Sequence, residues 1–83
     1  MPQSARNTSQ IGAAIRRARR QSRLTQADLG AKTGLRQATI SDLERGEGDV
    51  RLSTLLEVLA ALGLELTIDE RGRASAERLE DLF

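Results

Sequence analysis

The hydrophobic positions of this chain recur with the spacing of helical faces. The first apolar stripe has the i, i+3, i+4, i+7 spacing of an amphipathic helix; it consists of Ile11, Ala14, Ile15 and Ala18. This stripe predicts a helix from about Gln10 to Ser22, with Thr8 or Ser9 as its N-cap. Residues 1–8 are polar and aperiodic, which is typical of a flexible N-terminal arm.

A second, shorter helix is expected over residues 26–33. Thr25 is a good N-cap, and Asp28 in the first turn lies at the positive end of the helix dipole. Gly34 stands where a helix end requires a residue with positive φ. The next helix must follow after only one or two residues.

Two more helices complete the helical pattern. One is expected over about 36–45 and is ended by Gly46. The other is expected to be capped by Ser53 and to run through Leu62 before Gly63. Their buried stripes are Ile40 and Leu43 in the former, and Leu55, Leu56, Leu59 and Leu62 in the latter.

The pattern changes at residues 64–68, where Leu64, Leu66 and Ile68 alternate with polar residues as in a half-buried β-strand. A single strand leaves its backbone N–H and C=O groups unpaired, and a second copy related by a two-fold axis would pair them. Residues 64–69 are therefore interpreted as a dimerisation strand. Continuation of the preceding helix, or an ordered coil, is the alternative.

The last residues, 70–83, are polar and acidic and are expected to be flexible or to form a short helix. A helix here would present Leu79, Leu82 and Phe83, which we interpret as a possible docking site for a protein partner. The whole pattern predicts an all-α domain of four to five helices over 9–63, followed by one short strand.

Composition removes most catalytic chemistry. The 83 residues contain no His and no Cys, so neither an imidazole nor a thiolate is available as a general base, nucleophile or zinc ligand. We expect no catalytic residues, no metal site and no cofactor. The longest apolar run, 58–64, is far shorter than a membrane span, and a cytoplasmic, nucleoid-associated protein is expected.

The net charge of +1 hides an asymmetry along the chain. Residues 1–45 carry nine basic and three acidic residues, whereas residues 46–83 carry four basic and nine acidic ones. Such a division favours a nucleic-acid surface in the first half and a protein-contact surface in the second, although charges clustered by chance on solvated faces give the same pattern.

Residues 25–46 carry the strongest motif. Thr25-Gln26, Leu29 followed by a small residue, Gly34, Ile40-Ser41 and Glu44-x-Gly46 stand in register, and the segment resembles the Cro/C1-type (Xre) helix-turn-helix signature. The resemblance implies a lambda-repressor-like DNA-binding fold. Two positions depart from it: Gly30 stands where the family usually has Ala, and Arg23 stands where it often has Gly.

A helix-turn-helix places its second helix in the major groove, where residues near the start of that helix reach base edges. Gln37 can bond adenine, Arg36 guanine or phosphate, Asp42 a cytosine amino group, and Ala38 a thymine methyl. We therefore predict base contacts from Arg36, Gln37, Ala38 and Asp42. An ordinary solvated helix surface is the alternative for Ala38, Ser41 and Asp42.

Further polar residues suit the DNA backbone, which positions a protein without reading sequence. The predicted phosphate contacts are Gln26, Thr39, Ser41, Arg45, Arg16 and Arg17. Arg20 could also reach a phosphate, and the alternative for Arg16, Arg17 and Arg20 is that they only keep the surface soluble. Arg19 is different, because it lies at the edge of the first apolar stripe. The resemblance implies a structural salt bridge between Arg19 and Glu44.

The helix-turn-helix followed by one helix and a terminal strand resembles the HipB-like antitoxins, whose paired C-terminal strands close a dimer. The run 36–41 is also close to the recognition helix of that family. This resemblance implies a homodimer on a palindromic operator, repression of its own operon, and neutralisation of a HipA-like kinase toxin. The alternatives are a stand-alone phage-like repressor and an antitoxin of an unrelated toxin; an enzyme is disfavoured by the missing neutral-pH base.

Overall fold

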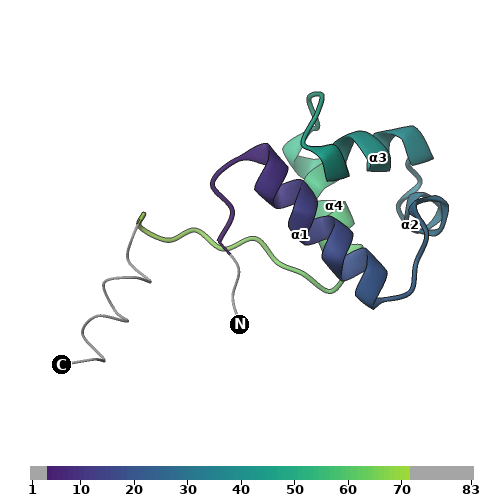
Figure 1. Cartoon of the computed structure of the whole chain (residues 1–83), viewed down its shortest axis with the longest axis horizontal. Helices are drawn as coiled ribbons and strands as arrows, with labels where there is room; N and C mark the ends of the chain where they lie inside the picture. The colour runs from purple at the N-terminus through teal and green to yellow at the C-terminus, as the bar shows by residue number, and fades with distance from the viewer. Residues whose placement is uncertain (1–3, 72–83) are drawn as a thin grey trace.

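The computed structural model describes residues 4–71, and this part of the chain contains four α-helices (Figure 1). They are α1 (Thr8–Gln21), α2 (Gln26–Thr33), α3 (Gln37–Arg45) and α4 (Leu52–Ala61). α1 packs along α3, α3 packs on α2, and α4 packs mainly on α2. The described residues thus form an all-helical domain, as expected from the apolar pattern.

α1 begins earlier than predicted, and its N-cap is neither Thr8 nor Ser9. Asn7 caps it: the Asn7 side-chain oxygen accepts a hydrogen bond from the Gln10 backbone N–H at 2.8 Å. The Thr8 hydroxyl instead donates to the Gly46 carbonyl at 3.0 Å, which ties the start of α1 to the end of α3. The expected cap was wrong because this tertiary hydrogen bond draws Thr8 into the first turn.

The predicted ends of α2 are confirmed. The Thr25 hydroxyl accepts from the Asp28 backbone N–H at 3.0 Å, and the Asp28 carboxylate accepts from the Thr25 N–H at 2.9 Å. This reciprocal capping box satisfies two amides that the helix itself leaves unpaired. The hydrogen bonds from Thr25 lower the pKa of Asp28. Gly34 ends the helix with φ of 71°.

α4 corrects two details of the prediction. Its N-cap is Arg51, so Ser53 lies inside the helix and not at its start, and the earlier start gains the bond from Leu55 N–H to the Arg51 carbonyl at 3.0 Å. The buried stripe includes Val58 in place of Leu56, whose side chain is 44% exposed. The contact with α2 therefore sets a slightly different face from the one that leucine spacing alone indicates.

The core lies where the four helices meet. Four side chains in it are fully buried: Ile15, Leu29, Ile40 and Val58, one from each helix. Leu43, Leu55 and Leu59 complete the cluster, and Ile11, Leu35, Ala61 and Leu62 pack against it. Burial of each large aliphatic side chain stabilises the fold by about 1.5–3 kcal/mol.

Gly12 permits the close approach of α1 and α3. A Cβ atom at this position would lie 2.4 Å from the Glu44 carbonyl oxygen and 2.5 Å from that of Leu43. Both atoms belong to the α3 backbone, which cannot turn aside as a flexible side chain can. The sequence pattern assigned Gly12 no role, because a glycine between apolar positions carries no signal of the helix that it will face.

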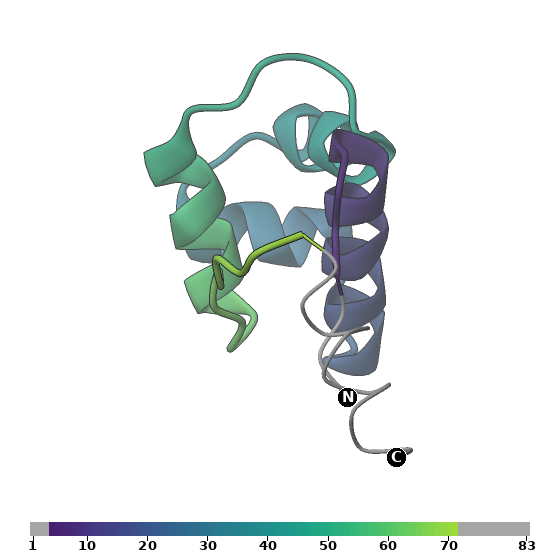
Figure 2. The ribbon, with the colours of Figure 1, turned by 90° about the vertical axis from the view of Figure 1, so that its left-hand side faces the viewer.

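After α4 the chain does not form the expected strand. Residues 64–70 have neither helix nor strand structure, and Figure 2 shows this segment passing beside the residues that precede α1. A ladder needs a second strand, and within residues 4–71 no segment forms strand pairing with this one. Leu66 and Ile68 are 47% and 91% exposed. The predicted docking residues Leu79, Leu82 and Phe83 lie outside the described residues.

Candidate nucleic-acid interface

A short, tight turn sets the angle between α2 and α3. The Leu35 N–H donates to the Gly30 carbonyl at 2.9 Å, so the chain folds directly back over the end of α2. A Cβ at Gly30 would lie 2.7 Å from the Leu35 carbonyl oxygen. The glycine that stands in place of the usual Ala therefore lies where the turn packs too closely on α2 to leave room for a Cβ atom.

The second difference from the family signature, Arg23, lies in the turn before α2. Arg23 has φ of 59°, the left-handed region that favours glycine, and is the one described non-glycine residue with positive φ. The turn thus keeps the left-handed backbone that Gly supplies in the family signature, even though its residue is Arg.

The first turn of α3 is open to solvent. Arg36 is the N-cap of the helix, Gln37 is its first residue, and both side chains are exposed, as are Ala38 and Asp42. Ile40 and Leu43 turn the opposite face into the core. The four residues predicted to contact bases therefore share the outer face of one short helix.

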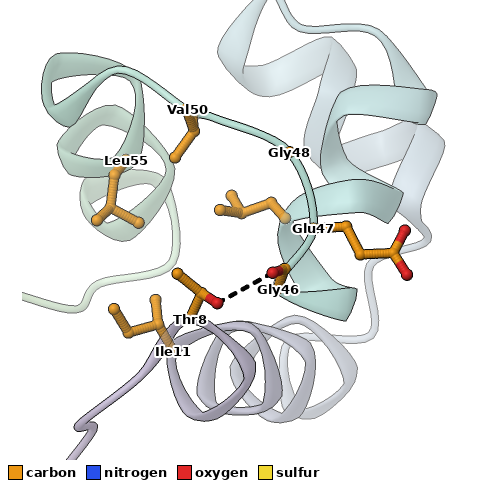
Figure 3. A pocket seen from close by; sticks show the side chains of 8 residues that line it. Thr8, Ile11, Gly46, Glu47, Gly48, Val50 and Leu55 are labelled. Atoms are coloured by element: carbon orange, nitrogen blue, oxygen red, sulfur yellow. Dashed lines mark hydrogen bonds between the residues drawn. The ribbon is translucent and has the colours of Figure 1, made fainter.

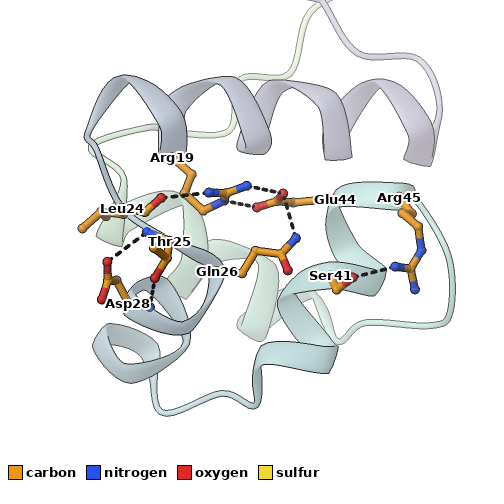
Figure 4. Close-up of polar contacts among 8 residues, drawn as sticks. All are labelled: Arg19, Leu24, Thr25, Gln26, Asp28, Ser41, Glu44 and Arg45. Atoms are coloured by element: carbon orange, nitrogen blue, oxygen red, sulfur yellow. Dashed lines mark hydrogen bonds and ion pairs between the residues drawn. The ribbon is translucent and has the colours of Figure 1, made fainter.

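Behind this helix lies a buried polar cluster (Figure 4). Arg19 on α1 and Glu44 on α3 form a two-pronged ion pair, with Nε to Oε2 at 2.6 Å and Nη2 to Oε1 at 3.0 Å. Arg19 also donates through Nη1 to the Leu24 carbonyl at 2.8 Å. Both charged residues are only 8% exposed. The pair expected from the family resemblance is thus present and buried.

Gln26 joins this cluster, a contact that its place in the sequence did not indicate. Its side-chain Nε2 donates to Glu44 Oε1 at 3.2 Å, so a residue predicted to contact phosphate is held by the buried carboxylate. An amide nitrogen carries two hydrogens, and the second one stays available to a ligand. Glu44 therefore orients Gln26 at the first residue of α2.

The electrostatics of the cluster favour the charged forms. Burial raises the pKa of Glu44, but hydrogen bonds from Arg19 and Gln26, together with the positive charges of Arg19 and Arg16, bring it below its ordinary value. The hydrogen bond to Glu44 raises the pKa of Arg19, an effect that its own burial opposes. The pair consequently remains ionised through the neutral range.

Arg45, at the end of α3, is surrounded by acceptors. Its guanidinium donates to Ser41 Oγ at 2.6 Å, to Asp42 Oδ1 at 2.6 Å and to Glu47 Oε2 at 3.2 Å. Two predicted DNA-contacting residues, Asp42 and Arg45, are thus paired with each other. Glu47, immediately beyond α3, was not singled out from the sequence, and only its spacing of two residues from Arg45 could have indicated it.

A surface hollow brings several predicted phosphate contacts together. It is lined by Arg16, Arg19, Arg20, Gln26, Ser41, Glu44 and Arg45, which come from α1, α2 and α3. Arg20, exposed on α1, lines the hollow together with Arg16. Thr39 is half-buried and Arg17 is exposed; neither lines this hollow.

A second hollow, shown in Figure 3, is apolar. It is lined by Thr8, Ile11, Leu43, Gly46, Glu47, Gly48, Val50 and Leu55. The Thr8–Gly46 hydrogen bond lies at its edge, and the Glu47 carboxylate points away from it. Its lining offers no set of converging polar groups for catalysis.

Two other kinds of site are not found within residues 4–71. No group of three or more acidic, His or Cys side chains is placed to hold a metal ion. Nor is any helix of this described part long and apolar enough to cross a membrane.

Comparison with known proteins agrees with this arrangement. Residues 15–68 match the model of a helix-turn-helix family, HTH_3. Antitoxin HipB of Escherichia coli K12 is 35% identical over 72 residues, a match that covers 87% of this chain and 82% of HipB.

Two solved structures are similar over nearly their full length. A HipB–O2 20mer complex has a chain with a TM-score of 0.77 and 32% identity, covering 86% of this chain and 99% of that one. A HipA–HipB–O2–O3 complex has a chain with a TM-score of 0.75 and 31% identity, covering 84% and 99% respectively. The four described helices therefore have the lambda-repressor-like arrangement that these chains share.

Proposed function

This chain belongs to the helix-turn-helix family and is related to the HipB antitoxins, and on that premise we propose that it is a sequence-specific DNA-binding repressor and the antitoxin of a HipBA-like operon. One observation carries the DNA-binding role. The exposed start of α3 and a hollow lined by Arg16 and Arg20 of α1 and Arg45 of α3 belong to the same four-helix domain.

In the proposed complex α3 enters the major groove. Arg36, Gln37, Ala38 and Asp42 then face base edges, because they share its exposed side. The hollow receives a backbone phosphate, with Gln26 and Ser41 as neutral donors and Arg16 as the cation, and Arg45 reaches this phosphate only when it is released from Asp42 and Glu47. Thr39 and Arg17 are proposed to contact phosphates that flank it.

Replacing Gln37 with Ala tests this assignment. The expected cost is about 1–3 kcal/mol of operator affinity, with relaxed preference at one base pair, because a bidentate adenine contact is lost. The measurement is a titration of operator variants, the operator having first been identified by sequencing DNA recovered with the native protein.

Arg16→Ala is the matched control for that prediction. It should weaken binding to all sequences about equally and flatten the salt dependence, because a phosphate contact carries no sequence information. If the Gln37→Ala protein binds every operator variant with the affinity of the parent protein, the assignment of α3 as the recognition helix is wrong.

The proposed functional unit is a homodimer on a palindromic operator, since two-fold symmetry lets two copies of α3 read two half-sites. Residues 64–68 are proposed to pair with the same segment of a second copy. The exposure of Leu64, Leu66 and Ile68 supports this proposal, because three large apolar side chains in one short segment are left in water.

Leu66→Asp is expected to give monomers, because two carboxylates would be forced together near the two-fold axis without a counter-charge. Sedimentation at several concentrations measures the change. Thr67→Asp, one residue further along the same exposed segment, is the control and should leave a dimer intact, since alternate residues of a strand face opposite sides. If the Leu66→Asp protein remains a dimer, the dimer interface lies elsewhere than in residues 64–68.

The antitoxin role adds a protein partner, a HipA-like kinase toxin. Its support is the HipB relationship over most of the chain and the excess of acidic residues after residue 45. Leu79, Leu82 and Phe83 remain the proposed docking residues. Mass spectrometry of whatever co-purifies with the native protein decides the role: a kinase-like partner supports it, an unrelated toxin redirects it, and no partner favours a stand-alone repressor. The proposed place of action is the cytoplasm, at the nucleoid.

A further inference from the structure

The guanidinium of Arg45 donates hydrogen bonds to three side chains that are close to it in the sequence. Ser41 and Asp42 approach it from the preceding turn of α3, at 2.6 Å each, and Glu47 approaches from the loop that follows the helix, at 3.2 Å. We call Asp42, Arg45 and Glu47 the acidic clamp. All three side chains are more than half exposed, so the clamp lies at the surface, where DNA would meet it.

The acidic clamp has a net negative charge, although Arg45 at its centre is positively charged. Two carboxylates face one guanidinium, which leaves a net charge of −1 on these three side chains. They lie at the carboxyl end of α3, where the helix dipole adds partial negative charge. These three side chains together therefore disfavour a phosphate, whereas Arg16 and Arg20 of the adjacent hollow attract one, as does the first turn of α3 with Arg36 and the positive end of the dipole.

We propose that Glu47 is a specificity-determining residue that withholds Arg45 from DNA phosphates. This inference rests on the proposed DNA-binding function. Sequence-independent binding depends almost entirely on phosphate neutralisation. A cation already paired with two carboxylates contributes little to it, so the clamp lowers the affinity for DNA of any sequence.

The two carboxylates differ in what they can do at the DNA surface. Asp42 lies on the exposed face of α3, where a base edge can take up its oxygens in place of Arg45. Glu47 lies beyond the helix and has no proposed base contact. By pairing with Arg45 it thus weakens binding to every sequence, and an element that acts against binding is a recognised means of discriminating against wrong partners.

The test is Glu47→Gln, measured on a mixed-sequence duplex of about two helical turns, which serves as the non-specific probe. We expect binding about fivefold tighter at low salt, since an exposed ion pair is released. The slope of log affinity against log salt should steepen by up to about one, because Arg45 gains a phosphate. The size of the gain should shrink as the salt concentration rises.

Two controls separate this mechanism from a general loss of negative charge. Asp49→Asn removes a carboxylate from the same exposed loop that is not a partner of Arg45. The double variant Arg45→Gln with Glu47→Gln, compared with Arg45→Gln alone, shows the effect of Glu47→Gln when the guanidinium is absent. The proposal requires a larger gain from Glu47→Gln than from Asp49→Asn, and no gain from Glu47→Gln once Arg45 is absent.

The proposed role of Glu47 is overturned if Asp49→Asn raises the affinity for the duplex as much as Glu47→Gln does. It is also overturned if Glu47→Gln raises the affinity fully in a protein that already carries Arg45→Gln. If the unmodified protein does not bind the duplex or its own operator at all, the proposed function itself fails, and the inference falls with it. The affinity of the unmodified protein therefore distinguishes the two failures. Unchanged thermal unfolding of the exposed-site variants shows that each measurement is made on folded protein.

Discussion

Glu44→Ala is expected to lower the free energy of unfolding by about 3–5 kcal/mol, the usual cost of removing one partner from a buried ion pair. The substitution leaves the Arg19 guanidinium, itself only 8% exposed, without its carboxylate in the core. It also releases Gln26 from its hydrogen bond. Denaturant unfolding followed by circular dichroism measures the change, which for a small domain removes much of the total stability.

Glu57→Ala is the matched control, because it deletes an exposed carboxylate from α4. It should change the free energy of unfolding by no more than about 0.5 kcal/mol. A Glu44→Ala variant as stable as this control would show that the Arg19–Glu44 pair does not hold α1 on α3.

A second substitution at this position, Glu44→Gln, tests the pH dependence of stability. The pKa of Glu44 is lowered in the folded chain, so its contribution to stability is present above the ordinary carboxyl pKa and is lost as the pH falls through the lowered value. The parent and Glu44→Gln should therefore differ most at neutral pH and converge in acid. Unfolding curves across this range give the difference directly.

Gly12→Ala is the second substitution with a large expected effect, a loss of about 3 kcal/mol. Alanine is ordinarily favoured over glycine inside a helix by about 1 kcal/mol. Here the added methyl group meets the backbone of α3 at 2.4–2.7 Å, and α1 must move away to make room. That movement strains the Thr8–Gly46 and Arg19–Glu44 contacts at the two ends of the interface.

The expected Gly12→Ala result is a fall in thermal midpoint of more than about 10 °C, given about 4–8 °C for each kcal/mol in a domain of this size. Arg20→Ala, on the exposed side of the same helix, controls for helix propensity and should be close to neutral. A Gly12→Ala variant that is more stable than the parent would mean that α1 and α3 are not in such close contact.

The features that the sequence predicted correctly are those that local chemistry determines. The N-cap at Thr25, the positive φ of Gly34 and the inward side of α3 depend on neighbouring residues, and the structure confirms them. The helix-turn-helix motif determines the arrangement of α2 and α3 through residues that are close in the chain. For this reason the exposed face of α3 could be predicted from the sequence, and the DNA contacts assigned to it remain a proposal.

The remaining differences arise from contacts distant in the chain. The cap of α1 changed because Thr8 bonds to Gly46, 38 residues away. The role of Gly12 depends on the α3 backbone, and Gln26 is held by Glu44. The expected strand at 64–68 is absent from the described single chain because its ladder requires a second segment. No periodicity within one stretch of sequence carries such information.

The shared carboxylate of Glu44 has a consequence for folding cooperativity. One side chain on α3 accepts hydrogen bonds from Arg19 on α1 and from Gln26 on α2, so separation of α1 from α3 leaves a buried charge without its partner, and separation of α2 removes a further hydrogen bond from the same carboxylate. Opening of one of these helices therefore weakens the contacts of the other two. The slowest amide protons of α1, α2 and α3 should consequently exchange in a single all-or-none event.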